Sequence, residues 1–170
     1  MAATANQTEL VHTLLAQMSG GESALCAPVI DGLLELGYVP KKHKKSAFAV
    51  EFEKHGRIIA KMEISPEKGL IFWLRFSAGE SYSQIFEDAV KRRPEAWVKR
   101  DQQWVSQDVS KCCGLCKGNP RFYHHINGEG VRIDRCGGYT LPVPGVTAAD
   151  LPELLRLIGE QDDFFEKLCG

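Results

Sequence analysis

The sequence lacks the motifs that mark several large enzyme classes. It contains no GxxxxGK[ST] phosphate-binding loop, no GxGxxG after a strand pattern, no HExxH and no GxSxG. These motifs are typical of nucleotide hydrolases, dinucleotide-dependent enzymes, zinc proteases and α/β-hydrolases. The sequence therefore favours a binding protein over an enzyme, without deciding between the two.

Segments for membrane insertion and secretion are also missing. No apolar run approaches the length of about 20 residues that a membrane-spanning helix needs, and residues 1–7 lack the basic start of a signal peptide. The formal net charge of −1 gives no overall attraction to nucleic acid or to an anionic membrane. Six cysteines without a secretion signal indicate a reducing compartment. We expect a cytoplasmic protein that binds neither membrane nor nucleic acid; the oligomeric state cannot be read from the sequence.

The hydrophobic pattern predicts one α+β domain over residues 1–170. Apolar residues at helical spacing indicate helices at about 8–18 and 27–36, the second starting near Cys26 with Pro28 in its first turn, and alternating patterns indicate strands at 47–53, 58–64 and 70–76. Further helices are expected from a capping box at Ser81–Gln84, around 97–105 and from 151, the last broken near Gly159. The predicted order is α-α-β-β-β-α-α-β-β-α, an antiparallel three-stranded meander plus a C-terminal hairpin, packed against helices. The lysine-rich run 41–45 is interpreted as a solvated loop, because no aromatic residue is interleaved with it.

The first two strands allow a prediction of their register. A three-residue loop at 54–56 would place Phe52 opposite Ile58 and Val50 opposite Ala60, so that the apolar faces agree. A two-residue turn at His55-Gly56 would mix the faces. We therefore expect the longer loop, with Gly56 in the left-handed conformation.

Reactive side chains cluster in one stretch, at about residues 112–138. Cys113 and Cys116 have CxxC spacing, and Cys136 follows twenty residues later, with Tyr139 where a fourth cysteine would complete a zinc ribbon. Zinc prefers four ligands in a tetrahedron. The sequence predicts a possible structural zinc site with three cysteine ligands, and the candidates for the fourth position are Cys112, His124, His125, Cys26 and Cys169.

The segment between the cysteines carries a hairpin signal. Asn127-Gly128 lies between two alternating segments, which is typical of a tight β-turn. Loops of two or four residues both place Phe122, His124, Ile126, Val131 and Ile133 on one face, and Arg121, Tyr123, His125, Arg132 and Asp134 on the other. Such a hairpin would return Cys136 to the end that carries the CxxC pair.

Three functions fit these observations. The first is a binding or regulatory domain with a structural zinc ion; cysteines buried without metal explain the same residues equally well. The second is a metal-free pocket between the apolar face of the sheet and the helices, lined by Trp73, Trp97 or Trp104. The third is a redox sensor or enzyme in which Cys113 or Cys116 attacks as a thiolate and His124 or His125 acts as base.

Overall fold

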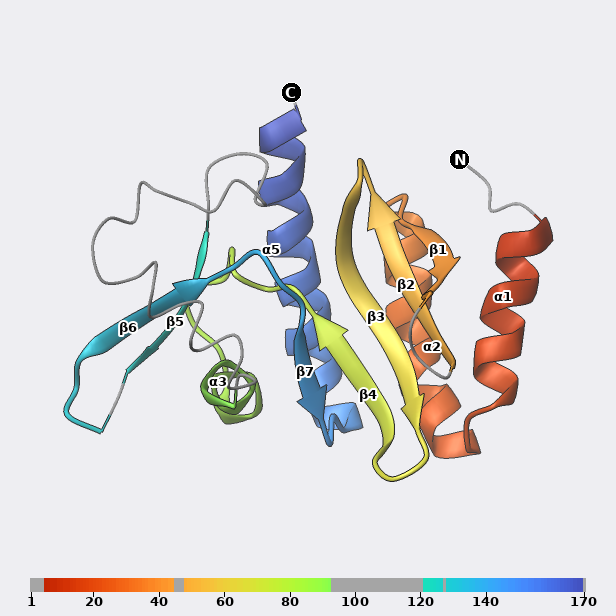
Figure 1. Cartoon of the computed structure of the whole chain (residues 1–170), viewed down its shortest axis with the longest axis horizontal. Coiled ribbons are helices and arrows are strands. Elements are labelled where there is room, and N and C mark those ends of the chain that lie inside the picture. Colours follow the sequence, from red (N-terminus) through yellow and green to blue (C-terminus); the bar gives the residue numbers. More distant parts are fainter. Residues whose placement is uncertain (1–4, 45–47, 93–120, 127, 170) are drawn as a thin grey trace.

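The structure, a computed structural model, describes residues 5–44, 48–92, 121–126 and 128–169 (Figure 1). It has the predicted α+β class: helices pack against a five-stranded antiparallel sheet, and two further strands form a separate ribbon. In chain order the elements are α1 (Ala5–Ala16), α2 (Gly20–Glu35), β1 (Val39–Lys42), β2 (Phe48–Lys54), β3 (Arg57–Ser65), β4 (Gly69–Leu74), α3 (Gln84–Lys91), β5 (Phe122–Ile126), β6 (Arg132–Cys136), β7 (Leu141–Pro144), the 3₁₀ turn η1 (Ala148–Asp150) and α5 (Leu151–Cys169).

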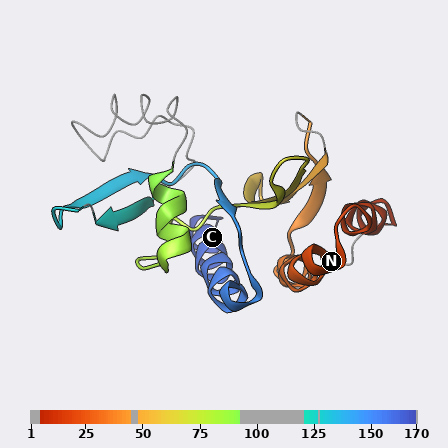
Figure 2. The same cartoon turned by 90° about the horizontal axis from the view of Figure 1, so that it is seen from below.

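The main sheet has the strand order β1-β2-β3-β4-β7, and the helices α1, α2 and α5 all lie on one side of it (Figure 2). Apolar side chains that alternate along the strands face these helices and form one buried cluster. Phe52, Met62 and Phe72 from the sheet are at most 1% exposed, as are Leu33 and Leu154 from the helices. The burial of these apolar side chains is the main force that holds the helices on the sheet.

The start of α2 is tied to the sheet by one glutamate. Ser19 and Glu22 form a reciprocal capping box, in which the Ser19 backbone N–H donates to Glu22 Oε2 at 2.9 Å. The other oxygen of the same carboxylate accepts the backbone N–H of Leu70, also at 2.9 Å. Hydrogen bonds from the Ser19 backbone and hydroxyl, and then from Leu70, lower the pKa of Glu22. The helix therefore begins at Gly20, before the predicted start near Cys26, because the cap is at Ser19.

The predicted register of β2 and β3 is wrong, although the faces agree. Phe52 pairs with Ala60 and Val50 pairs with Met62, and the turn consists of His55 and Gly56 alone, both at positive φ. An irregularity between Phe52 and Glu53 shifts the register by one residue. This bulge brings the apolar faces together, which a two-residue turn by itself would not do.

Two strands of the main sheet were not predicted, and both lie at its edges. β1 contains Lys41 and Lys42, so these residues do not belong to a loop as expected, and Lys41 Nζ lies 2.6 Å from Glu53 Oε1. β7 pairs with β4 and contains Pro142 and Pro144. Proline is tolerated at an edge because its missing N–H leaves no ladder hydrogen bond unmade.

The last helix is longer than the sequence indicates. α5 continues through Gly159 for 19 residues, because its buried face continues past the glycine with Gln161, Asp162 and Phe165. The expected helix around residues 97–105 lies outside the described residues. Within the described part of the chain, no helix combines the length and apolar composition needed to cross a lipid bilayer.

Candidate functional site: the hairpin base and the arginine junction

The predicted hairpin is present as β5 and β6, which project to one side of the main sheet (Figure 1). Its register differs from the prediction by one residue. His124 pairs with Asp134, and Ile126 pairs with Arg132, so the loop spans the five residues 127–131. Since paired residues share a face, His124 lies with Asp134 and Cys136, whereas the expected partition placed Asp134 with His125.

The hairpin is anchored at one end. Tyr123 is fully buried, its ring centroid lies 4.8 Å from that of Phe76, and its hydroxyl donates to the carbonyl of Tyr139 at 2.7 Å. At the far end, the side chains of Ile126 and Val131 are 55% and 52% exposed. We call the anchored end the hairpin base and define it as residues 121–122 and 136–138.

The hairpin base is seated against the end of β4 with no room for a side chain at Gly137. The Gly137 N–H donates to the carbonyl oxygen of Arg121 at 3.1 Å. A Cβ on Gly137 would lie 2.3 Å from that oxygen and 2.4 Å from Ser77 Cβ. Cys136 is half-buried at this base, and its Sγ accepts the Gly138 N–H at 3.4 Å.

The cysteines of the predicted zinc site are divided between two parts of the chain. Cys112, Cys113 and Cys116 lie outside the described residues. Among the residues that are described, no three His, Cys, Asp or Glu side chains gather where they could hold a metal ion. Zinc binding is therefore still a prediction from the sequence.

The two cysteines considered as distant ligands have clear positions. Cys26 is fully buried in the core on α2, and burial, followed by the charge of Glu22, raises the pKa of its thiol to about 12. Cys169 is exposed at the end of α5. The expectation of Cys26 as a small buried apolar residue agrees with its position, and its place in the core argues against a role as zinc ligand.

The two candidate histidines face opposite sides of the hairpin. His124 Nδ1 lies 2.7 Å from Asp134 Oδ1, on the face that also carries Cys136. Although burial opposes the charged carboxylate, hydrogen bonds from Arg132 and His124 hold the pKa of Asp134 below its usual value. The pairing orients the His124 ring, as a carboxylate does for a catalytic base or a metal ligand.

His125 is enclosed on the other face. It is 7% exposed, and its Nδ1 has no hydrogen-bond partner among the described residues. Burial, and next the positive charge of Arg135, lowers the pKa of His125, so the imidazole is neutral at pH 7. A histidine in this position is poorly placed to reach a ligand that Cys136 contacts.

A second cluster, which the sequence did not indicate, adjoins the hairpin base. The guanidinium groups of Arg57 and Arg75 lie 5.2 and 5.5 Å from the centroid of the Phe165 ring, and that of Arg121 lies 5.3 Å from the Phe164 ring. We call these five residues the arginine junction. Arg121 belongs to both features, and Arg75 Nη2 donates to the carbonyl of Gly138 at 2.6 Å. The junction thus brings together the ends of β3, β4 and β5 on the C-terminal half of α5.

Two buried donors at this place lack acceptors. Arg75 Nε and Gln161 Nε2 are both inaccessible to solvent and have no hydrogen-bond partner among the described residues. The oxygen of the Gln161 amide is occupied, since it accepts from the Ser77 hydroxyl at 3.2 Å and from the Ala78 N–H at 3.0 Å. A buried donor without an acceptor costs about 1–3 kcal/mol, so two such donors at one place are unusual in a folded protein.

The carboxylates beside the junction are occupied by a lysine. Lys54 Nζ lies 3.0 Å from Asp162 Oδ1 and 2.7 Å from Glu166 Oε1. Burial disfavours the charged ammonium, but the hydrogen bonds that it donates to Glu166 and Asp162 raise the pKa of Lys54 above its usual value. Asp162 and Glu166 therefore share Lys54 as a partner, and Glu166 Oε1 also lies 3.5 Å from His55 Nε2.

Of the three tryptophans that were predicted to line a pocket, the structure describes Trp73. Trp73 alternates with the buried Phe72 and Leu74, so its side chain lies on the face of the sheet away from the helices, where Lys61 Nζ is 4.1 Å from its ring. This face is not the one that the helices cover, so the position of Trp73 gives no support to a pocket between sheet and helices. Trp97 and Trp104 lie outside the described residues.

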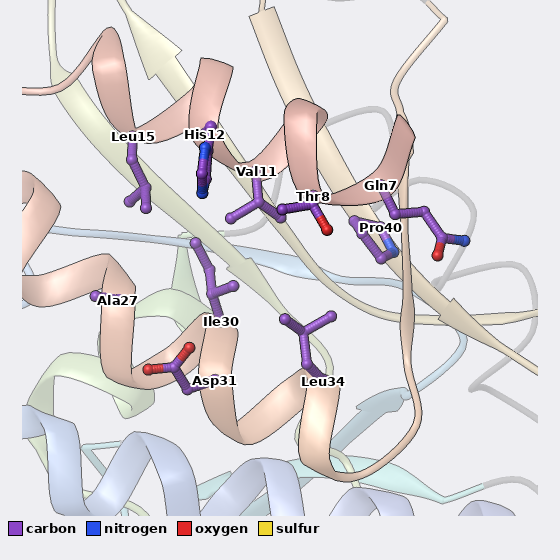
Figure 3. Close-up of a pocket in the computed structure, with 10 residues that line it drawn as sticks. All are labelled: Gln7, Thr8, Val11, His12, Leu15, Ala27, Ile30, Asp31, Leu34 and Pro40. Carbon is purple, nitrogen blue, oxygen red and sulfur yellow. The ribbon is translucent and has the colours of Figure 1, made fainter. Parts of the chain in front are cut away.

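The structure instead has a pocket of about 230 Å³ between α1 and α2, next to Pro40 of β1 (Figure 3). It is lined mostly by apolar side chains, among them Val11, Leu15, Ile30 and Leu34. The volume is below the range of roughly 300–1,000 Å³ that is usual for small-molecule sites. The pocket alone gives little support for a ligand-binding function.

Comparison with known proteins gives no relative: no family model, no curated protein and no solved structure matches this chain. Any assignment of function has to be built on the hairpin base and the arginine junction.

Proposed function

We propose that this protein is a small cytoplasmic binding domain in which a structural zinc ion closes the hairpin base. The observation that carries the proposal is the position of Cys136. It pairs with Phe122 across the base, and the next residue donates a hydrogen bond to Arg121. Five residues separate Cys116 from Phe122, so the segment with the CxxC pair joins the hairpin beside Cys136.

The proposed ligands are Cys113, Cys116 and Cys136, with His124 preferred over His125 for the fourth position. His124 shares the face of Cys136, and its Nδ1 is already held by Asp134. Metal-binding histidines commonly have such a carboxylate behind the ring, which leaves Nε2 for the metal. Arg132 Nη2 lies 3.1 Å from this Nε2 and would have to move aside. Cys112 is the alternative, although neighbouring cysteines rarely reach one ion together.

A structural metal ion would stabilise the two-stranded ribbon formed by β5 and β6. A two-stranded ribbon is marginally stable by itself, and β5 and β6 form a sheet separate from the main one. Zinc binding contributes directly to folding energy when the ligands come from separated segments. The ion would fasten the base, while the exposed far end of the hairpin would be available to a partner.

Thiol chemistry is the second candidate, since His124 and Asp134 form the pair that orients a catalytic base. In that case Cys113 or Cys116 would be the attacking thiolate, and no zinc would be required.

The test is a zinc analysis of protein purified without chelator or metal-affinity contact, with thiols counted before and after denaturation. We expect about one zinc ion per chain, with Cys169 reactive in the native state and the ligand cysteines protected until unfolding. Cys136→Ser should lose the metal, and the matched variant Cys169→Ser should retain it. Absence of zinc from the native protein would refute the proposal. Reactive thiols would then favour thiol chemistry, and hidden thiols would favour a ligand pocket.

A further inference from the structure

Arg75 and Arg121 of the arginine junction lie over aromatic rings of α5. Seven lysine and arginine side chains of the described residues pair with carboxylates: Lys41, Lys54, Lys61, Lys91, Arg92, Arg132 and Arg156. Arg75 and Arg121 contact phenylalanine rings and, for Arg75, a backbone carbonyl, and neither forms an ion pair with a described carboxylate. Two guanidinium groups therefore lie over adjacent rings of α5 without an ion-pair partner among the described residues.

The local structure holds these charges in place. Phe164 and Phe165 are adjacent, with ring centroids 6.2 Å apart, and each has at least one guanidinium group over it. Stacking on a ring fixes the plane of a guanidinium group and leaves its edge free to donate hydrogen bonds. The Arg75 guanidinium is further fixed by its bond to Gly138. A guanidinium group held in this way loses little conformational entropy when it binds an oxyanion.

The unsatisfied donors lie at the same place. Arg75 and Gln161 meet at the Gly137–Gly138 turn, because Arg75 donates to Gly138 and Ser77 bridges Gln161 to Gly137. Both side chains have a buried nitrogen without an acceptor among the described residues, and Gln161 itself is 0% exposed. An acceptor with several oxygens could satisfy both nitrogens. The nearby carboxylates Asp162 and Glu166 share Lys54 as a partner and accept from neither nitrogen.

We propose that the arginine junction binds a phosphate group, held by Arg75 and Arg121 with the Gln161 amide as a further donor. A phosphate monoester carries a charge of about −1.5 to −2 at neutral pH, which two guanidinium groups balance. It also has three acceptor oxygens that point in different directions, which suits donors from different elements. The group belongs either to free phosphate or to a phosphorylated small molecule. This proposal does not depend on zinc, because none of its ligands is a cysteine or histidine.

The experiment is a titration of the full-length protein with inorganic phosphate and with phenyl phosphate, followed by calorimetry and by the ¹⁵N resonances of arginine side chains. Sulfate and acetate serve as anion controls. We expect saturable binding at millimolar concentrations or below and a shift of the Arg75 and Arg121 signals. Phenyl phosphate binding more tightly than phosphate would identify a phosphorylated molecule as the ligand. Equal affinities would identify free phosphate.

Three variants locate the binding. Arg75→Lys keeps the positive charge but removes the planar set of guanidinium donors. Arg121→Gln removes the charge of an exposed side chain that is not part of the core. Each should weaken binding about tenfold, as expected for loss of one charge-assisted contact. Arg156→Gln removes a charge on α5 that has carboxylate partners, and it should leave the affinity unchanged.

Absence of saturable binding would overturn the proposal, and would mean that water satisfies the two buried donors. Equal binding of sulfate and acetate, or equal affinity in all three variants, would also overturn it, since either result indicates general attraction of anions. A negative zinc analysis would affect the proposed function alone and would leave these outcomes unchanged.

Discussion

Replacing Gly137 by alanine should destabilise the protein, because the hairpin base has no space for a side chain at this position. The added Cβ would lie 2.3 Å from the carbonyl oxygen of Arg121 and 2.4 Å from the Cβ and Oγ of Ser77. The first contact is with backbone, which cannot turn away as the end of a flexible side chain can. Arg121 or Ser77 would have to move by about 1 Å to restore ordinary van der Waals distances.

The magnitude follows from two contributions. Overpacking at a tight site typically costs about 1–3 kcal/mol. The displacement also weakens the hydrogen bond from the Gly137 N–H to Arg121, now 3.1 Å long, and a bond of this kind contributes roughly 0.5–1.5 kcal/mol. We expect Gly137→Ala to lower the free energy of unfolding by about 2–4 kcal/mol. For a chain of this size that corresponds to a fall in Tm of roughly 5–15 °C.

The matched control is Gly159→Ala in α5. A Cβ there would meet nothing within 4 Å, and the residue lies inside a continuous helix. Alanine should therefore stabilise the protein by up to about 1 kcal/mol through helix propensity. Urea unfolding followed by far-UV circular dichroism gives both values. Equal stability of Gly137→Ala and the wild type would refute the packing of the hairpin base against β4.

Two further predictions concern side chains whose partners the structure identifies. Above the unfolded pKa of about 6.5, His125 is neutral in both states, and below it the folded protein resists protonation. The free energy of unfolding should therefore fall as the pH drops from about 6.5 through the lowered folded pKa. Urea titrations at several pH values should show that His125→Gln reduces this dependence. A variant with the same pH profile as the wild type would contradict the enclosed position of the ring. Glu22→Ala should cost about 1–3 kcal/mol because it removes the α2 capping box and the bond to Leu70. Glu35→Ala, at the exposed C-terminal end of the same helix, should change stability little, and equal effects of the two variants would argue against the role of Glu22.

The fold class could be predicted because apolar periodicity reports burial locally. Phe48, Val50 and Phe52 alternate with polar or small residues, and they occupy the helix-covered side of the sheet as that pattern requires. The edge strands were missed for a related reason. β1 and β7 have four residues each and contain proline, so they are too short and irregular to show a period.

Register was predicted less well than strand position, because it depends on turn geometry. A bulge after Phe52 and a five-residue loop after Ile126 both changed pairing without changing the alternation. The five-residue loop also determines which side chains can interact. It places Asp134 beside His124 and leaves His125 enclosed on the other face. The position of Cys136 near the start of β5 was anticipated, because any hairpin joins its two ends.

The sequence by itself determined the α+β class, the amphipathic elements and the return of Cys136 to the start of the hairpin, since each of these depends on neighbouring residues. The tertiary structure alone decided the arginine junction. Arg57, Arg75 and Arg121 are far apart in the chain and follow no period, and they meet because the C-terminal half of α5 presents Phe164 and Phe165 to the ends of three strands. Where a charged side chain finds its partner depends on how the elements cross, and local propensity carries no information about that crossing.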